Sequence, residues 1–154
     1  MDTFLSFIVA AVLAASPLLF GTLGEILTEK SGHLNLGVEG MMFMGGALGL
    51  GGAFYYEKIA GAAANGYIAV LIAIICSFLA GAFGALLFSF ITITLRANQN
   101  VTGLTLTIFG GGVANFFGGS LNTMAGGVGQ ISVATSSAIY RANVNNVADL
   151  GMVG

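Results

Sequence analysis

The sequence predicts an all-α protein: a polytopic bundle of about four transmembrane helices, followed by a polar C-terminal tail. Apolar residues make up 56% of the 154 residues and charged residues only 6%, whereas about a quarter of the residues in a soluble domain are charged. Four basic and six acidic side chains are too few to cover the surface of a soluble fold this large. A lipid bilayer makes no such demand, so we expect a multi-pass membrane protein.

Four apolar stretches have about the 20 residues that a helix needs to cross the hydrocarbon core. These stretches are residues 4–23, 36–56, 67–95 and 101–117. The third is longer than one perpendicular crossing requires, so it tilts, extends beyond the membrane or breaks near 81–84. Pro17 is expected to kink the first, because proline removes a backbone donor and clashes with the preceding turn. Segment 118–154 is rich in Asn and Ser, which predicts an extramembrane tail that includes a short surface helix.

Glycine is unusually frequent, with 25 residues against a single proline. Many of these glycines lie inside apolar runs, as in 45–52. Small residues allow transmembrane helices to approach closely. The pattern therefore favours helix packing, with the lining of a solute path as the alternative.

Several classes of function are excluded by composition. One histidine and one cysteine, His33 and Cys76, cannot form a metal cluster or a disulfide framework. No nucleophile with a base, paired-carboxylate site or phosphate-binding loop is present. A net charge of −2 without a basic patch argues against a nucleic-acid partner. We expect no catalytic residues, no metal and no cofactor.

Membrane orientation normally follows the bias of Lys and Arg between the two sides. With four spans, Lys30 and Arg96 fall on one side, and Lys58 and Arg141 fall on the other. Two against two leaves the orientation open.

The most informative stretch is 24–46, where Asn35 and Glu39 stand inside or beside an apolar run. An ionised carboxylate near the bilayer centre costs a few kcal/mol, so it normally faces a protein interior or a water-filled path. Nearby glycines permit a broken backbone at membrane depth, and a discontinuous helix offers backbone groups to a solute. We expect Asn35 and Glu39 to line a solute path. The alternative is that Glu39 caps a helix or pairs with Lys30 or Arg96.

A second polar stretch, 96–103, directly precedes an apolar helix. Asn100 or Thr102 could cap that helix, and its free amides could also face a polar solute. Asn98 and Thr102 are therefore further candidates for a solute path, with capping alone as the alternative.

The first polar stretch reads GEILTEKSGHLNLGVEGMMFMGGALG. It resembles the start of the permease subunits of bacterial ABC importers for nucleosides and simple sugars, relatives of the branched-chain amino-acid permeases. The family pattern is approximately E-(R/K)-x-G-x-(L/I)-N-(L/I)-G-x-E-G-M-M. The residues that match it in order are Glu29, Lys30, Gly32, Leu34, Asn35, Leu36, Gly37, Glu39, Gly40, Met41 and Met42.

The second polar stretch resembles the family's polar turn, usually N-(E/Q)-V-(V/I)-(S/T)-G-(L/I). The corresponding residues are Asn98, Gln99, Val101, Thr102 and Gly103. The match requires that Asn100 be read as an insertion. Together with the spacing of the apolar runs, the resemblance covers residues 1 to about 120, the N-terminal portion of a family whose members are about twice this length.

The resemblance implies a permease subunit of a bacterial inner membrane that moves a nucleoside or simple sugar inward by alternating access. Its implied partners are ATP-binding ABC subunits, a second permease subunit and an external solute-binding lipoprotein. Selectivity in such systems depends largely on the lipoprotein, so the solute itself is not specified.

Two other functions are compatible with the composition. A small self-contained oligomeric channel or ion-coupled transporter would associate through its glycine faces and would conduct without ATP. A membrane assembly factor would bind a partner without any dependence on a solute.

Overall fold

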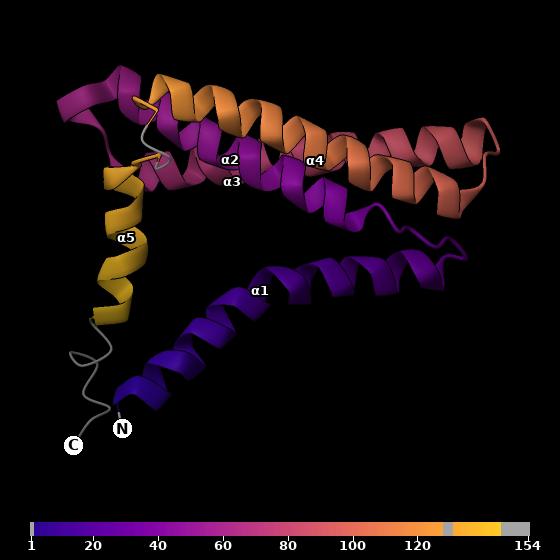
Figure 1. Ribbon diagram of the computed structural model, residues 1–154, viewed down its shortest axis with the longest axis horizontal. Helices are drawn as coiled ribbons and strands as arrows, with labels where there is room; N and C mark the ends of the chain where they lie inside the picture. The colour runs from indigo at the N-terminus through magenta and orange to yellow at the C-terminus, as the bar shows by residue number, and fades with distance from the viewer. Residues whose placement is uncertain (1, 128–130, 146–154) are drawn as a thin grey trace.

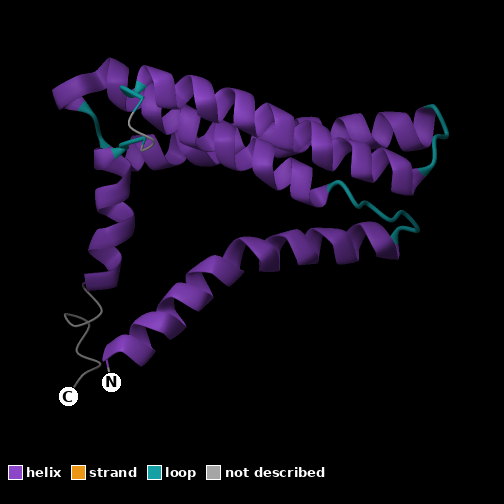
Figure 2. Cartoon of the chain, viewed as in Figure 1, coloured by secondary structure: helices purple, strands orange, loops and turns teal. Residues whose placement is uncertain are grey.

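The computed structural model describes residues 2–127 and 131–145, and every regular element in these residues is a helix (Figure 2). In chain order the elements are α1 (Asp2–Lys30), α2 (Val38–Ala60), the 3-10 turn η1 (Gly61–Ala63), α3 (Gly66–Ser89), the π-helical turn η2 (Phe90–Thr94), α4 (Gln99–Met124) and α5 (Ala134–Asn145). The predicted all-α class is confirmed.

Three helical segments of the described chain are long and apolar enough to cross a membrane. They are Phe4–Lys30, Gly66–Thr94 and Gln99–Met124. Only 0%, 11% and 22% of their most apolar windows are buried inside the protein, so most of their apolar surface is left for lipid. The fourth long helix, α2, has 23 residues, about 35 Å at 1.5 Å per residue, and lies within the same bundle (Figure 1).

Two helices extend beyond the predicted apolar stretches. α1 continues past residue 23 to Lys30. α4 continues through residues 118 and 119 to Met124, where the sequence predicts the beginning of the tail. The hydroxyls of Ser120 and Thr123 donate to backbone carbonyls one turn earlier. The glycines at positions 118 and 119 do not end the helix, because its backbone hydrogen bonds are otherwise complete.

α2 lies between α3 and α4, which hardly touch each other (Figure 1). Three glycines of α2 face α3. A Cβ added at Gly49 would collide with the Ser77 hydroxyl, and a Cβ at Gly52 would lie 2.7 Å from Cys76 Sγ. Ser77 Oγ donates to the Gly45 carbonyl at 2.8 Å. The small residues therefore let the two helices approach closely enough for an interhelical hydrogen bond.

The contact between α2 and α4 is closer still, because backbone meets backbone. A Cβ added at Gly40 would collide with the Leu106 carbonyl oxygen and lie 2.7 Å from Thr107 Cα. A Cβ added at Gly110 would collide with the backbone of Gly40. No flexible side chain stands between the helices here, so neither glycine can be enlarged without separating them.

α1 contacts the bundle through its C-terminal half. A Cβ at Gly21 would lie 2.7 Å from Met42 Sδ and 3.6 Å from Val38 Cγ1, which places this part of α1 against the first turns of α2. The helix bends near its middle and its N-terminal half diverges from the bundle (Figure 1). Pro17 lies inside α1, in agreement with the kink that the sequence predicts.

α5 runs crosswise at the opposite end of the bundle (Figure 1) and is held there by Glu57. The two carboxylate oxygens of Glu57 accept from Ser136 N at 2.8 Å and from Thr135 N at 3.1 Å. Burial alone would raise the pKa of Glu57, but these hydrogen bonds outweigh it and hold the pKa below its ordinary value. Glu57 therefore caps the N-terminus of α5 as a carboxylate.

We expect Gly110→Ala to lower the free energy of unfolding by about 1–3 kcal/mol, because the added methyl group forces two backbones apart. The matched control is Gly46→Ala, since Gly46 is also helical but has nothing within 4 Å of an added Cβ. It should be neutral, or stabilising by up to about 1 kcal/mol through helix propensity. Unfolding in detergent micelles, followed by circular dichroism, measures both. Equal stabilities would contradict the contact.

We expect the docking of α5 to persist above about pH 4.5, the ordinary pKa of the Glu57 carboxyl, and to weaken as the pH falls through the lower folded-state pKa. The docking of α5 is measured by hydrogen exchange at the amides of Thr135 and Ser136, corrected for the intrinsic pH dependence of the exchange rate. Glu57→Gln should reduce their protection about tenfold at neutral pH. The control is Glu29→Gln at the other end of the bundle, which should leave this protection unchanged.

Candidate functional site

α2 begins inside the bundle rather than at its end. Its first turn packs on Leu106 and Gly110 of α4, which lie about 10 and 16 Å from the start of α4 at 1.5 Å per residue. Because α4 is one of the candidate membrane spans, we expect the N-terminus of α2 to lie at membrane depth. This is the broken backbone that the glycines of 24–46 predict.

The non-helical segment 31–37 runs beside the first turns of α4. Leu34 N donates to Gln99 Oε1 at 3.0 Å, and Thr107 Oγ1 donates to the Leu36 carbonyl at 2.8 Å. Gly103 leaves room for this segment, since a Cβ there would lie 2.8 Å from Leu36 N. Side chains of α4 thus supply hydrogen-bond partners for backbone groups of this non-helical segment.

Asn35 is buried, with 5% of its surface exposed, and organises the turn into α2. Its Oδ1 accepts from Gly37 N at 3.0 Å, and its own backbone N donates to Glu25 Oε1 at 2.9 Å. Glu25 Oε2 also accepts from the Thr28 hydroxyl at 3.1 Å. The side chain of Asn35 therefore stabilises the turn, and the backbone N–H of Asn35 connects the turn to Glu25 of α1.

Glu39 lies in the first turn of α2, and its side chain is exposed. No side chain caps this helix. Glu39 makes no ion pair with Lys30 or Arg96 in the described residues. A carboxylate in the first turn is favoured by the helix dipole, which offsets part of the cost of placing Glu39 in a membrane.

Glu25 and Glu39 line one groove, of about 470 Å³, between α1 and α2. The rest of its lining consists of Leu18, Gly21, Thr22, Val38, Met42 and Phe43. The two carboxylates and the Thr22 hydroxyl are hydrogen-bonding groups on an otherwise apolar surface. This combination suits a small polar solute better than a lipid chain.

Asn98 and Thr102 serve the start of α4. Asn98 Oδ1 accepts from Asn100 N at 3.0 Å and from Val101 N at 3.3 Å. Thr102 is buried and donates to the Asn98 carbonyl at 2.9 Å. The cap of this helix is therefore Asn98, and not Asn100 or Thr102 as the sequence analysis suggested, because only Asn98 has the extended backbone of an N-cap residue.

The four residues predicted to line a path do not share one cavity. Glu39 faces the α1–α2 groove, whereas Thr102 lines a separate apolar groove of about 460 Å³ between α3 and α4. Asn35 and Asn98 are not among the lining residues of either groove, and their side chains accept backbone amides at the starts of α2 and α4. The structure adds Glu25, which the sequence analysis does not single out. The apolar residues on both sides of Glu25, in Leu23-Gly24-Glu25-Ile26-Leu27, are the signal that was available.

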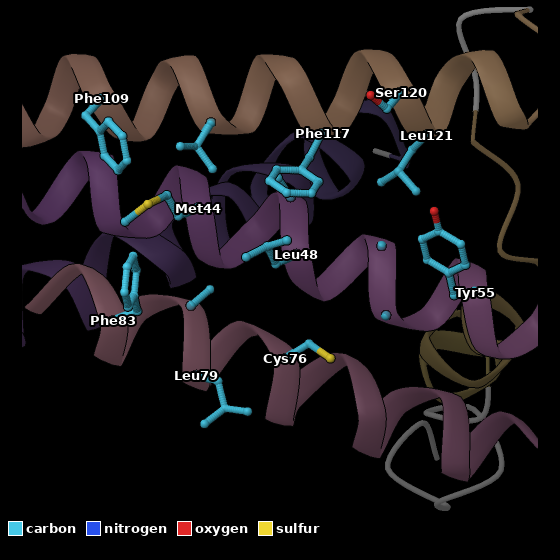
Figure 3. A pocket seen from close by; sticks show the side chains of 15 residues that line it. Met44, Leu48, Tyr55, Cys76, Leu79, Phe83, Phe109, Phe117, Ser120 and Leu121 are labelled. Atoms are coloured by element: carbon cyan, nitrogen blue, oxygen red, sulfur yellow. The ribbon is translucent and has the colours of Figure 1, made fainter. Parts of the chain in front are cut away.

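A larger groove of about 620 Å³ lies over α2, between α3 and α4 (Figure 3). Leu48, Phe83 and Phe117 are among the apolar side chains around it. Tyr55 and Ser120 supply its hydroxyls, and the Tyr55 hydroxyl is already in contact with Met124 Sδ at 3.2 Å. Its chemistry suits apolar groups, so size alone does not make it the solute site.

Residues 7–149 match the family described as "Branched-chain amino acid transport system / permease component". The chain is 40% identical over 109 residues to the putative glucose ABC transporter permease protein TsgC13 of Haloferax volcanii, an alignment that covers 71% of this chain and 30% of that one. It is 32% identical over 113 residues to the guanosine ABC transporter permease protein NupQ of Bacillus subtilis, covering 73% and 34%.

The alignments span about a third of the length of these curated relatives. No solved structure matches the chain.

We expect Asn98→Ala to destabilise the protein by about 1 kcal/mol, because two amides at the start of α4 lose their acceptor. Asn100→Ala is the matched control, since the Asn100 side chain is exposed and does not cap the helix. Thermal unfolding in micelles compares the two variants. If both lose the same stability, Asn98 is not the cap.

Proposed function

The chain belongs to the family of branched-chain amino acid transport system permease components, and from this we propose that it forms part of the membrane-spanning subunit of an ATP-driven ABC importer. It is a multi-pass protein of the inner membrane. The proposed solute is a nucleoside or a simple sugar. The two relatives are named for glucose and for guanosine, which both carry a ring with several hydroxyl groups.

The observation that carries this proposal is the start of α2 inside the bundle, beside the α1–α2 groove. The first amides of a helix have no intrahelical acceptor, and no side chain caps α2. Val38 and Glu39, two residues of this turn, line the groove. The groove thus combines backbone donors with the carboxylate acceptor of Glu39. Both oxygens of Glu25 already accept hydrogen bonds, from Asn35 N and from the Thr28 hydroxyl. Sugar hydroxyls both donate and accept hydrogen bonds, so they match both kinds of group.

The predicted path residues have different roles in this proposal. Glu39 contacts the solute, because its carboxylate is exposed in the groove. Asn35 and Asn98 are positioning residues, since their side-chain oxygens already accept backbone amides. Thr102 is buried beside the other groove and supports the start of α4.

Alternating access requires that the groove open and close. α1 forms one wall of the groove and meets the bundle only through its C-terminal half. None of its most apolar window is buried. The opposite wall, α2, is held by backbone contact with α4. We therefore assign the movement to α1 and the fixed wall to α2.

The proposed partners are ATP-binding ABC subunits, a second permease subunit and a solute-binding lipoprotein. ATP hydrolysis belongs to the separate ATP-binding subunits. The chain itself contributes binding, orientation and movement, with no covalent step.

We expect Glu39→Gln, in the complete importer, to reduce uptake of radiolabelled guanosine or glucose about tenfold or more. The variant loses a charged acceptor, and a hydrogen bond to a charged group contributes about 1.5–3 kcal/mol. The control is Glu29→Gln on the exposed end of α1, which should transport normally. Both variants are compared at equal amounts of protein in the membrane.

Normal uptake by Glu39→Gln would remove Glu39 from the site. A second measurement tests the importer itself. The purified chain is reconstituted into liposomes without ATP or partner subunits, and solute or ion flux is recorded. Flux under these conditions would contradict the importer and indicate a self-contained channel or ion-coupled transporter.

A further inference from the structure

The groove of about 460 Å³ between α3 and α4 lies at the end of the bundle where these two helices are connected. Leu87 and Ile91 line one wall, and Val101, Thr105 and Phe109 are on the other. Both walls belong to candidate membrane spans. Val101 and Phe109 are 62% and 48% exposed, so the groove is accessible from outside the chain.

The polar side chains in the lining of the α3–α4 groove are already paired within α4. Thr102 Oγ1 donates to the Asn98 carbonyl at 2.9 Å, and Thr105 Oγ1 donates to the Val101 carbonyl at 2.8 Å. The remaining lining residues are apolar. A sugar or nucleoside would lose its hydrogen bonds to water here without replacing them. The groove therefore suits a hydrocarbon chain.

The connection between α3 and α4 closes one end of this groove and places Arg96 there. On one side, Ala97 N donates to the Ile91 carbonyl at 3.1 Å. On the other, Thr102 N donates to the Asn98 carbonyl at 3.0 Å. Ile91 and Thr102 belong to the two opposite walls. Arg96 therefore lies where the walls meet, with its side chain exposed.

The backbone conformation of Arg96 is unfavourable for an arginine. Its φ is 53°, and no other non-glycine residue of the described chain has a positive φ. A Cβ disfavours this conformation, whereas glycine adopts it freely. Within residues 2–127 and 131–145 the guanidinium makes no hydrogen bond, ion pair or ring contact. An anionic partner outside these residues would explain why a long cationic side chain is present here.

We infer that the α3–α4 groove binds an anionic phospholipid, with an acyl chain in the groove and the phosphate on Arg96. An arginine at the end of a membrane span extends its head group toward the lipid interface, and its planar donors can hold two phosphate oxygens. Basic side chains at pockets between membrane helices hold anionic head groups in this way. The acyl chain fills the space between two helices that hardly touch each other.

This inference is independent of solute transport. It requires only that α3 and α4 cross a membrane, and a chain that transports nothing can still hold the lipid. The test therefore measures lipid binding and not uptake.

The chain contains no tryptophan, so a single introduced tryptophan reports which lipid is next to it. Phe109→Trp places the probe in the groove. Ile108→Trp is the matched control, because Ile108 is 77% exposed at nearly the same depth but does not line the groove. The whole chain is reconstituted in phosphatidylcholine bilayers. A small fraction of the lipid is brominated, either phosphatidylglycerol or phosphatidylcholine with the same acyl chains.

We expect brominated phosphatidylglycerol to quench the probe at position 109 about fivefold more strongly than brominated phosphatidylcholine. This is the preference expected from one basic side chain at an anionic head group. At position 108 the two lipids should quench equally.

Arg96→Gly, made in the Phe109→Trp background, removes the cation without weakening the fold, since glycine tolerates the positive φ. We expect it to abolish the preference for phosphatidylglycerol, and Arg96→Lys should keep part of it. Lys30→Gln is the matched charge control, because α1 ends at Lys30 at the same end of the bundle (Figure 1). This variant should keep the full preference.

A variant that leaves Arg96 in place tests the groove itself. Thr105 is exposed, so Thr105→Phe can fill the groove from its edge. It should lower the quenching by phosphatidylglycerol at position 109 to the value at position 108.

Three results would overturn the inference. Equal quenching at 109 by both lipids would mean that the groove takes an acyl chain without selecting an anionic head group. Equal loss of the preference in Arg96→Gly and Lys30→Gln would indicate attraction to the general surface charge. Absence of quenching at 109 by either lipid, with normal quenching at 108, would mean that another protein segment covers the groove.

Discussion

The backbone of α2 touches the backbone of α4 at Gly40 and Gly110, and this contact determines where the polar part of the molecule lies. It holds the first turn of α2 against the third and fourth turns of α4, so that α2 begins inside the bundle. The non-helical segment 31–37 before α2 must then run along α4. The groove that contains Glu25 and Glu39 exists because α1 meets α2 at that recessed start.

The fold class and several helices could be predicted from the sequence, because both depend on patterns within one stretch. Apolar length predicts spans, and the glycines around Asn35 predict a broken backbone at membrane depth. The roles of Asn35 and Asn98 could not be assigned in the same way. Their polarity is equally compatible with binding a solute and with holding a turn, and the choice depends on which amides lie within reach.

Glu25 is another residue whose role depends on its neighbours in space and cannot be assigned from the sequence around it. The sequence analysis does not single it out, yet its carboxylate accepts a hydrogen bond from the backbone N–H of Asn35 at 2.9 Å. The two residues are ten positions apart, across the end of a helix and a turn, and no periodicity links them. Likewise, glycines that pack on α3 or α4 cannot be distinguished in the sequence from those, such as Gly46, that face open space. How closely a helix approaches its neighbour depends on both helices, so it cannot be predicted from the sequence of one of them.

The hydrogen bonds from α4 to the segment before α2 have a consequence for the order of synthesis. The hydrogen-bond partners of Leu34 N and the Leu36 carbonyl are the side chains of Gln99 and Thr107. These lie 65 and 71 residues further along the chain, so they are synthesised later. At about 5–20 residues per second, the ribosome needs about 3–14 s to make them. During that interval the start of α2 lacks its partners, so it stays in contact with water or with the insertion machinery. The final arrangement of segment 31–37 and the start of α2 therefore forms only after α4 has entered the membrane.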